Sequence, residues 1–298
     1  MHSIEIPKLN IKMELPSEVS ELTPGQFRSF VHYHLLLKIG KLSYEQFRIA
    51  LLNAFVEFKE PLKKLSRQEK DNVYSEIYRL SELMNSFFTV IKENGEDKTE
   101  INISFIRNLI PVIFTPAGPL HGPADGLTDI SFFEYIDAHN HYIDYINSAS
   151  EESLNSLVAV LYRPQIPDYE NASLQEDFDG SRRVKYNPNV VELRSRDIGK
   201  LPFVERYGIF LYFHGCEQFL RNGEIPLGGN TIRFSTLYES SPGQSGDDTG
   251  LVGVLYTLAE SHVFGNVKET ANANLYDVMV RLYQLMKTYK NLKTSEES

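Results

Sequence analysis

Four short motifs that begin α-helices restrict the fold of this chain more than any other feature. Each places Ser or Thr at the N-cap and Gln or Glu three residues later: TPGQ at 23–26, SYEQ at 43–46, SRQE at 66–69 and SFFE at 131–134. In such a capping box the hydroxyl accepts a hydrogen bond from a free backbone N–H, and the third side chain reaches back to the N-cap N–H. Apolar residues at helical spacing follow these motifs, so the sequence predicts amphipathic helices.

The predicted elements are mostly helical. Caps and periodicity place helices at 24–39, 44–58, 67–92, 132–146, 151–162, 189–199, 203–222, 251–264 and 269–290. Alternating apolar residues predict one or two short strands before residue 12 and another at 101–105. The Pro- and Gly-containing stretch at 115–126 predicts a rigid loop, and those at 163–188 and 223–249 predict long polar loops.

The expected fold is therefore mainly α, an irregular multi-helix bundle with a few short strands and long polar loops. The loop at 115–126 is the expected boundary between an N-terminal helical subdomain, 1–114, and a C-terminal helical subdomain, 115–298. One continuous domain is the alternative.

Charge and cysteine content limit the class of partner. The chain has 30 basic against 40 acidic residues, a net charge of -10, and no basic block that would neutralise a phosphate backbone. Its one basic cluster, Arg182, Arg183 and Lys185, is typical of a solvated loop. One cysteine excludes an internal disulfide, and no apolar run is long enough to span a membrane. We expect protein partners, neither nucleic acid nor membrane, and a reducing cytoplasm.

The stretch EYIDAHNHYIDYI at 134–146 has the composition of a metal site. At 100° per residue, however, its polar residues separate. His139 falls with the apolar stripe, where a hydrogen-bonded core or boundary histidine is expected. Glu134, Asp137 and His141 fall on the opposite side, as weak candidates for a carboxylate-type metal site or as a solvated acidic stripe. The solvated stripe is the favoured interpretation, and no cofactor is predicted.

The segment FLYFHGCEQFL at 210–220 is apolar nearly all round, which predicts a central helix. Within it, His214 and Glu217 are three residues apart and form a candidate buried polar pair, either an acid–base pair or a polar clasp between helices. The clasp is favoured. Cys216 lacks an identifiable base and is expected to pack in the core. The Gly-rich GQSGDDTG at 243–250 has no phosphate-loop lysine and predicts a surface loop.

Three segments, 22–52, 122–164 and 250–285, together resemble an uncharacterised helical protein family. It is encoded in phage-like and prophage gene clusters of Bacteroidota, often near tail genes. The most specific pieces are LVAVLYRP at 157–164 and LAESHVFGNVKET at 258–270. The resemblance implies a role in tail assembly or as a virion component, either virion-associated or in the host cytoplasm. It transfers no catalytic residue.

The favoured function is a non-enzymatic interaction or assembly protein of a phage-like particle, such as a tail assembly chaperone or minor structural component. Two alternatives remain open. One is a metal-dependent enzyme built on Glu134, Asp137 and His141, to which Glu217 and His214 of a second helix could add ligands. The other is a small-molecule-binding module using the aromatic interior around Phe210, Tyr212 and Phe213.

Overall fold

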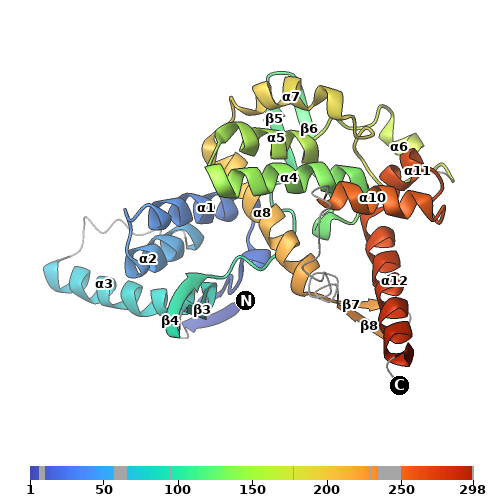
Figure 1. Ribbon diagram of the computed structural model, residues 1–298. Helices are drawn as coiled ribbons and strands as arrows, with labels where there is room; N and C mark the ends of the chain where they lie inside the picture. Colours follow the sequence, from blue (N-terminus) through green and yellow to red (C-terminus); the bar gives the residue numbers. More distant parts are fainter. Residues whose placement is uncertain are drawn as a thin grey trace. The chain divides into compact units, whose positions relative to one another are not determined.

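The structure is a computed structural model that describes residues 1–6, 11–56, 66–93, 95–176, 178–227, 230–233 and 250–296. The predicted mainly α fold is confirmed, because helices carry most of these residues and the strands occur as short antiparallel pairs (Figure 1). The chain divides into two compact units, Met1–Phe105 and Ile106–Ser298. This division falls before the loop at 115–126.

The first unit packs helices over an aromatic core. Its helices are α1 (Pro24–Lys38), α2 (Tyr44–Phe55) and α3 (Arg67–Ser81), with short 3-10 turns η2 (Val19–Glu21) and η4 (Glu82–Phe87). Complete capping boxes begin α1 at Thr23 and α2 at Ser43, as predicted. Phe30 lies at the centre of the core, with its ring centroid 6.1 Å from that of Phe47 and 5.9 Å from that of Phe87.

The first unit also contains two antiparallel pairings. Strand β1 (His2–Ile6) pairs with β2 (Ile11–Leu15), which confirms the predicted N-terminal strands. Strand β3 (Phe88–Glu93) pairs with β4 (Glu96–Ile101), where a helix to residue 92 was predicted. The prediction was wrong because it extended the helical stripe through residues 88–92, although Asn-Gly at 94–95 is a strong hairpin signal. Gly95 has φ +86°, which suits such a turn.

The second unit begins with the hairpin of β5 (Val112–Thr115) and β6 (Gly118–His121), followed by the turn η5 (Asp125–Leu127). The helices that follow are α4 (Phe132–Ser148), α5 (Glu151–Leu161), α6 (Tyr169–Ala172), α7 (Val191–Ile198, after the turn η6, Pro188–Val190) and α8 (Phe203–Asn222). After α8 come β7 (Glu224–Leu227) paired with β8 (Asn230–Arg233), and then α10 (Gly250–Glu260), α11 (Val267–Asn272) and α12 (Leu275–Glu296).

Helix α8 is central to the second unit, as its sequence predicts. Its buried residues lie all round the helix and include Phe210, Leu211, Tyr212, Phe213 and Cys216. Helix α5 packs against α4, α7 and α8 (Figure 1). The side chains of α5 from Leu157 to Leu161 are fully buried. This layer holds α4 and α8 in a fixed relation, which positions the polar residues they share.

All three predicted loops contain regular structure, and the loop at 163–188 includes the short helix α6. The rigid loop at 115–126 includes the second half of the β5–β6 hairpin and η5. The segment 223–249 carries the β7–β8 hairpin, while its residues 234–249, including most of the Gly-rich stretch, lie outside the described residues. Across the described chain, no helix combines the length and apolarity needed to cross a membrane.

Candidate functional site

A buried ionic cluster lies beneath the start of α4. Glu134, only 1% exposed, accepts hydrogen bonds from Arg163 Nη2 at 3.0 Å and from Arg183 Nη1 at 2.7 Å. Its Oε1 also forms an ion pair with Arg163 Nη1 at 2.7 Å. Arg183 also lies 3.3 Å from the carboxylate of Asp129. Two carboxylates therefore neutralise two guanidinium groups, which makes their burial tolerable.

Backbone carbonyls accept further hydrogen bonds from the two arginines, although Arg183 Nε has no hydrogen-bond partner among the described residues. Arg183 Nη1 donates to Leu161 O at 2.7 Å, and Arg163 Nε donates to Val184 O at 2.8 Å. These bonds tie the segment after α5 to the segment before α7 from both sides. The predicted exposed loop at 163–188 is therefore anchored in the core at both ends.

The prediction of a solvated basic cluster was wrong for Arg183, whose side chain is fully buried. Burial acts to lower the pKa of Arg183, but the carboxylates of Glu134 and Asp129 outweigh it and raise that pKa. For Arg163, burial prevails and lowers the pKa. Both groups remain charged near neutral pH, because a guanidinium does not lose its proton in proteins.

The predicted metal candidates do not gather. The carboxylate of Glu134 is occupied by the two arginines, so Glu134 is neither a free ligand nor part of a solvated stripe. Ser131 still caps α4, accepting from the Glu134 N–H, but the Glu134 side chain does not complete a capping box. Asp137 accepts from Tyr186 Oη, and burial, together with the Asp137 carboxylate, raises the pKa of Tyr186. No group of three or more possible metal ligands occurs among the described residues.

The predicted polar pair on α8 connects to α4. Glu217 accepts from His139 Nδ1 at 3.2 Å, and Tyr142 Oη lies 2.7 Å from His214 Nδ1. His214 and Glu217 thus each bridge to the neighbouring helix, which is the geometry of a clasp. His139 is hydrogen-bonded at the core boundary, as predicted, with its side chain 19% exposed. The adjacent Cys216 is buried, and burial raises the pKa of its thiol, which opposes a role as nucleophile.

Aromatic rings surround this clasp. The ring of Tyr142 lies 5.4 Å from Phe213 and 5.6 Å from Phe210, and Tyr145 lies 4.9 Å from Phe210. These rings fill the space between α4 and α8. The aromatic interior around Phe210 and Phe213 is therefore packed with the protein's own side chains.

We expect the free energy of unfolding to fall in alkaline solution, in part because Tyr142 ionises there. Burial, with the Glu217 carboxylate, raises the pKa of Tyr142 from its ordinary value of 10.0 to about 12. The folded state thus holds this proton more tightly than the unfolded state. The protonated Tyr142 therefore makes its full contribution to the free energy of unfolding below pH 10, and this contribution is lost as the pH rises to about 12. In Tyr142→Phe, the free energy of unfolding in urea should fall less steeply between these pH values than in wild type. A pH dependence in Tyr142→Phe as steep as in wild type would contradict the expectation.

Two hollows adjoin α10. A cavity of about 380 Å³ next to His139 is lined by His139, Asn140, Ile143, Asp144, Gly250 and Leu251. A groove of about 350 Å³ between α10 and α12 is lined by Gly250, Gly253, Val254, Thr257, Leu258, Leu282 and Leu285. The two hollows share Gly250 at the start of α10.

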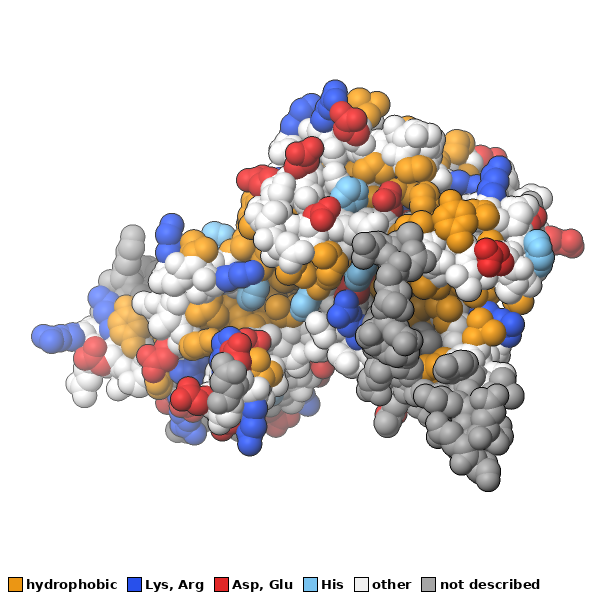
Figure 2. Space-filling view, viewed as in Figure 1, with side chains coloured by type: hydrophobic (Ala, Val, Ile, Leu, Met, Phe, Trp, Pro, Cys, Tyr) orange, Lys and Arg blue, Asp and Glu red, His pale blue; other side chains and the backbone are white. Residues whose placement is uncertain are grey.

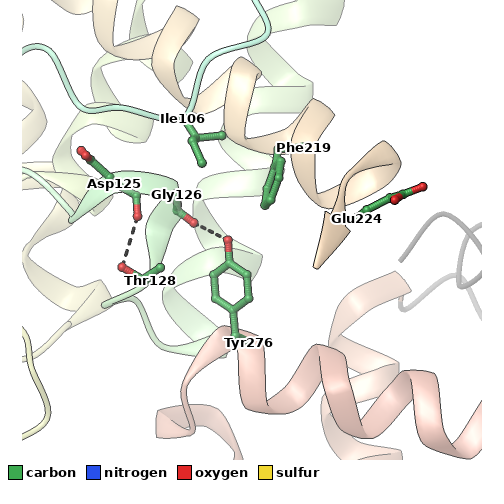
Figure 3. Close-up of a pocket in the computed structure, with 7 residues that line it drawn as sticks. All are labelled: Ile106, Asp125, Gly126, Thr128, Phe219, Glu224 and Tyr276. Carbon is green, nitrogen blue, oxygen red and sulfur yellow. Dashed lines mark hydrogen bonds between the residues drawn. The ribbon is translucent and has the colours of Figure 1, made fainter. Parts of the chain in front are cut away.

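A third pocket, of about 220 Å³, lies where η5, α8 and α12 meet (Figure 3). Ile106, Phe219 and the Tyr276 ring give it an almost entirely apolar wall. Tyr276 Oη donates to Gly126 O at 2.6 Å, so the polar tip is already occupied. The carboxylates of Asp125 and Glu224 point away from the centre of the pocket in Figure 3. This pocket can receive a small apolar group but offers no reactive side chain.

Sequence reasoning missed Arg163 and Arg183 as central residues. A signal was present for Arg163, because it directly follows the apolar run LVAVLY. The chain matches no protein-family model, no curated protein and no solved structure. The resemblance to the phage-like family therefore stays a prediction.

Proposed function

We propose that the protein is a non-enzymatic interaction protein that binds an amphipathic helix of a protein partner in the groove between α10 and α12. The observation that carries this proposal is the apolar stripe of α12. The stripe begins in the core, where Leu275 and Val278 are fully buried and Met279 is 4% exposed. It continues through Leu282 and Leu285 into the open groove, where Leu285 is 40% exposed.

Helix α10 supplies the opposite wall. It carries no charged residue before Glu260, and Leu251, Val252 and Val254 are only half-buried. Gly250 and Gly253 leave room for close approach of another backbone. Two half-covered apolar helices facing a shared groove match helix-in-groove recognition, in which a partner helix inserts side chains at helical spacing. Figure 2 shows, on the face in view, hydrophobic side chains, in orange, exposed among charged ones.

Charge favours one kind of partner. Arg281 precedes Leu285 by about one turn on the same side of α12, although the whole chain has a net charge of -10. A partner helix with an acidic residue beside its apolar face would complement this arginine. The ionic groups at the α4–α8 centre are meanwhile bound to one another, so this geometry favours contact over turnover.

The biological setting that we propose follows from the sequence resemblance. The protein would assemble with components of a phage-like tail, as an assembly chaperone or a minor structural component. A chaperone of an elongated helical tail protein would shield apolar helical segments until they assemble, which suits a groove open at the surface.

Co-expression with the long tail protein encoded nearby tests this proposal. We expect the two proteins to co-elute in size-exclusion chromatography. Leu285→Glu should lower the affinity at least about tenfold, since it places a charge in an apolar contact. Leu193→Glu is the matched control: Leu193 is 67% exposed on α7, and this variant should co-elute like wild type. Separate elution of the wild-type pair, or equal losses in the two variants, would contradict the proposal.

A further inference from the structure

We infer that the cavity beside His139 is a binding site for a primary alkylammonium group. The inference begins with the orientation of His139. Because Nδ1 is turned toward the buried Glu217 carboxylate at 3.2 Å, Nε2 is the ring nitrogen left to serve the cavity. A carboxylate at Nδ1 favours the tautomer in which Nδ1 carries the proton and Nε2 accepts hydrogen bonds.

The polar groups at the cavity match a cation. Asp144 adds an exposed carboxylate, and Asn140 adds an amide oxygen. With Nε2 of His139 these make a set of acceptors, which an ammonium group with three N–H donors can satisfy. Asp144 lines the cavity, and Glu217 lies behind His139 with Arg221 Nε 3.8 Å from its Oε2. The charges of these three side chains sum to a negative value, which favours a positive ligand.

Buried Glu217 adds a second reason. Its Oε2 has no hydrogen-bond partner among the described residues, although the side chain is 1% exposed. Arg221 Nε lies 3.8 Å away, beyond hydrogen-bonding distance, so this buried carboxylate is only partly neutralised and attracts positive charge. A cation bound at Nε2 of His139 would be separated from the Glu217 carboxylate only by the imidazole ring of His139.

The apolar part of the wall selects the rest of the ligand. Ile143 and Leu251 line the same cavity as the polar groups. A short aliphatic chain would pack on them while its ammonium group meets Asp144 and His139. The ligand class is therefore a primary amine on an aliphatic stem, either a free amine or the side chain of a partner lysine.

An NMR titration with n-butylammonium chloride tests the inference on the intact protein. The Ile143 and Leu251 methyl signals should shift along a saturating curve, whereas n-butanol, which has the same stem without the charge, should produce no such curve. Asp144→Asn should weaken n-butylammonium binding about fivefold. Asp97→Asn removes the same charge from β4 and should leave binding unchanged. Equal responses to the amine and the alcohol, or wild-type affinity in Asp144→Asn, would overturn the inference.

A peptide containing one lysine separates the two sources of the amine. Tighter binding of acetyl-Ala-Lys-Ala-amide than of n-butylammonium would assign the site to a partner lysine, and weaker binding would assign it to a free amine. Either result supports the alkylammonium class. Because Leu285→Glu alters the groove and Asp144→Asn alters the cavity, failure of the helix-binding proposal is distinguishable from failure of this one.

Discussion

Replacing Glu134 by Gln should lower the free energy of unfolding by about 3–5 kcal/mol, because it leaves two buried guanidinium groups short of their shared carboxylate. Arg163 and Arg183 are 3% and 0% exposed in their side chains, so water cannot replace the lost partner without opening the core. The amide oxygen of Gln can accept one bond, but it supplies no negative charge. Urea unfolding followed by circular dichroism measures the loss.

The matched control is Glu192→Gln on α7. Glu192 also pairs with an arginine, Arg196, but its side chain is 81% exposed. Exposed pairs contribute little, so this variant should lose less than about 1 kcal/mol. A loss in Glu134→Gln as small as that in Glu192→Gln would show that the cluster does not hold the fold.

A double-mutant cycle sharpens the test. Arg163→Gln alone should also destabilise, since it removes bonds to Glu134 and to the Val160 and Val184 carbonyls. Combined with Glu134→Gln, the two losses should not add, because the variants remove the same contact. Strict additivity would contradict the ion-pair geometry.

Replacing Phe213 by Ala should lower the free energy of unfolding by about 3–5 kcal/mol. Phe213 is fully buried, and its ring lies 6.4 Å from Tyr135 and 5.4 Å from Tyr142. Truncation removes an aromatic ring from the middle of the α4–α8 contact and leaves a cavity that the neighbouring rings cannot fill. The same urea experiment measures the loss.

Phe114→Ala controls for the loss of an aromatic residue as such. Phe114 is 76% exposed on β5, so its truncation should change stability by less than about 0.5 kcal/mol. Near-equal values for the two variants would mean that the α4–α8 contact is not a core. If Phe213→Ala does not fold, Phe213→Leu should fold with a smaller loss.

The sequence predicted the local structure of this chain correctly where the interacting residues lay within one helical turn of each other. Thr23 and Ser43 begin helices with complete capping boxes, because each box is formed by residues three apart. The signal for the hairpin of β3 and β4 was also local, because the dipeptide Asn-Gly at 94–95 favours such a turn. The misassignment came from extending a helical stripe through Phe87 and Phe88 into a run with strand propensity.

Local sequence signals did not predict the contacts of the candidate site. The helical wheel correctly showed that Glu134 and His139 point in different directions, but it could not show what each of them meets. Glu134 meets Arg183, 49 residues away, and His139 meets Glu217, 78 residues away. A polar face of a helix is solvated or buried according to what packs against it, and residue periodicity carries no information about that partner.

The sequence alone thus determined most of the helical elements and the apolar stripe of α12, because caps and periodicity act between residues a few positions apart. Only the tertiary structure decided that Glu134 and Arg183 lie in the core and that the end of the α12 stripe opens onto a groove. The physical reason is that burial, and the pairing of a charge that burial requires, depend on segments distant in sequence.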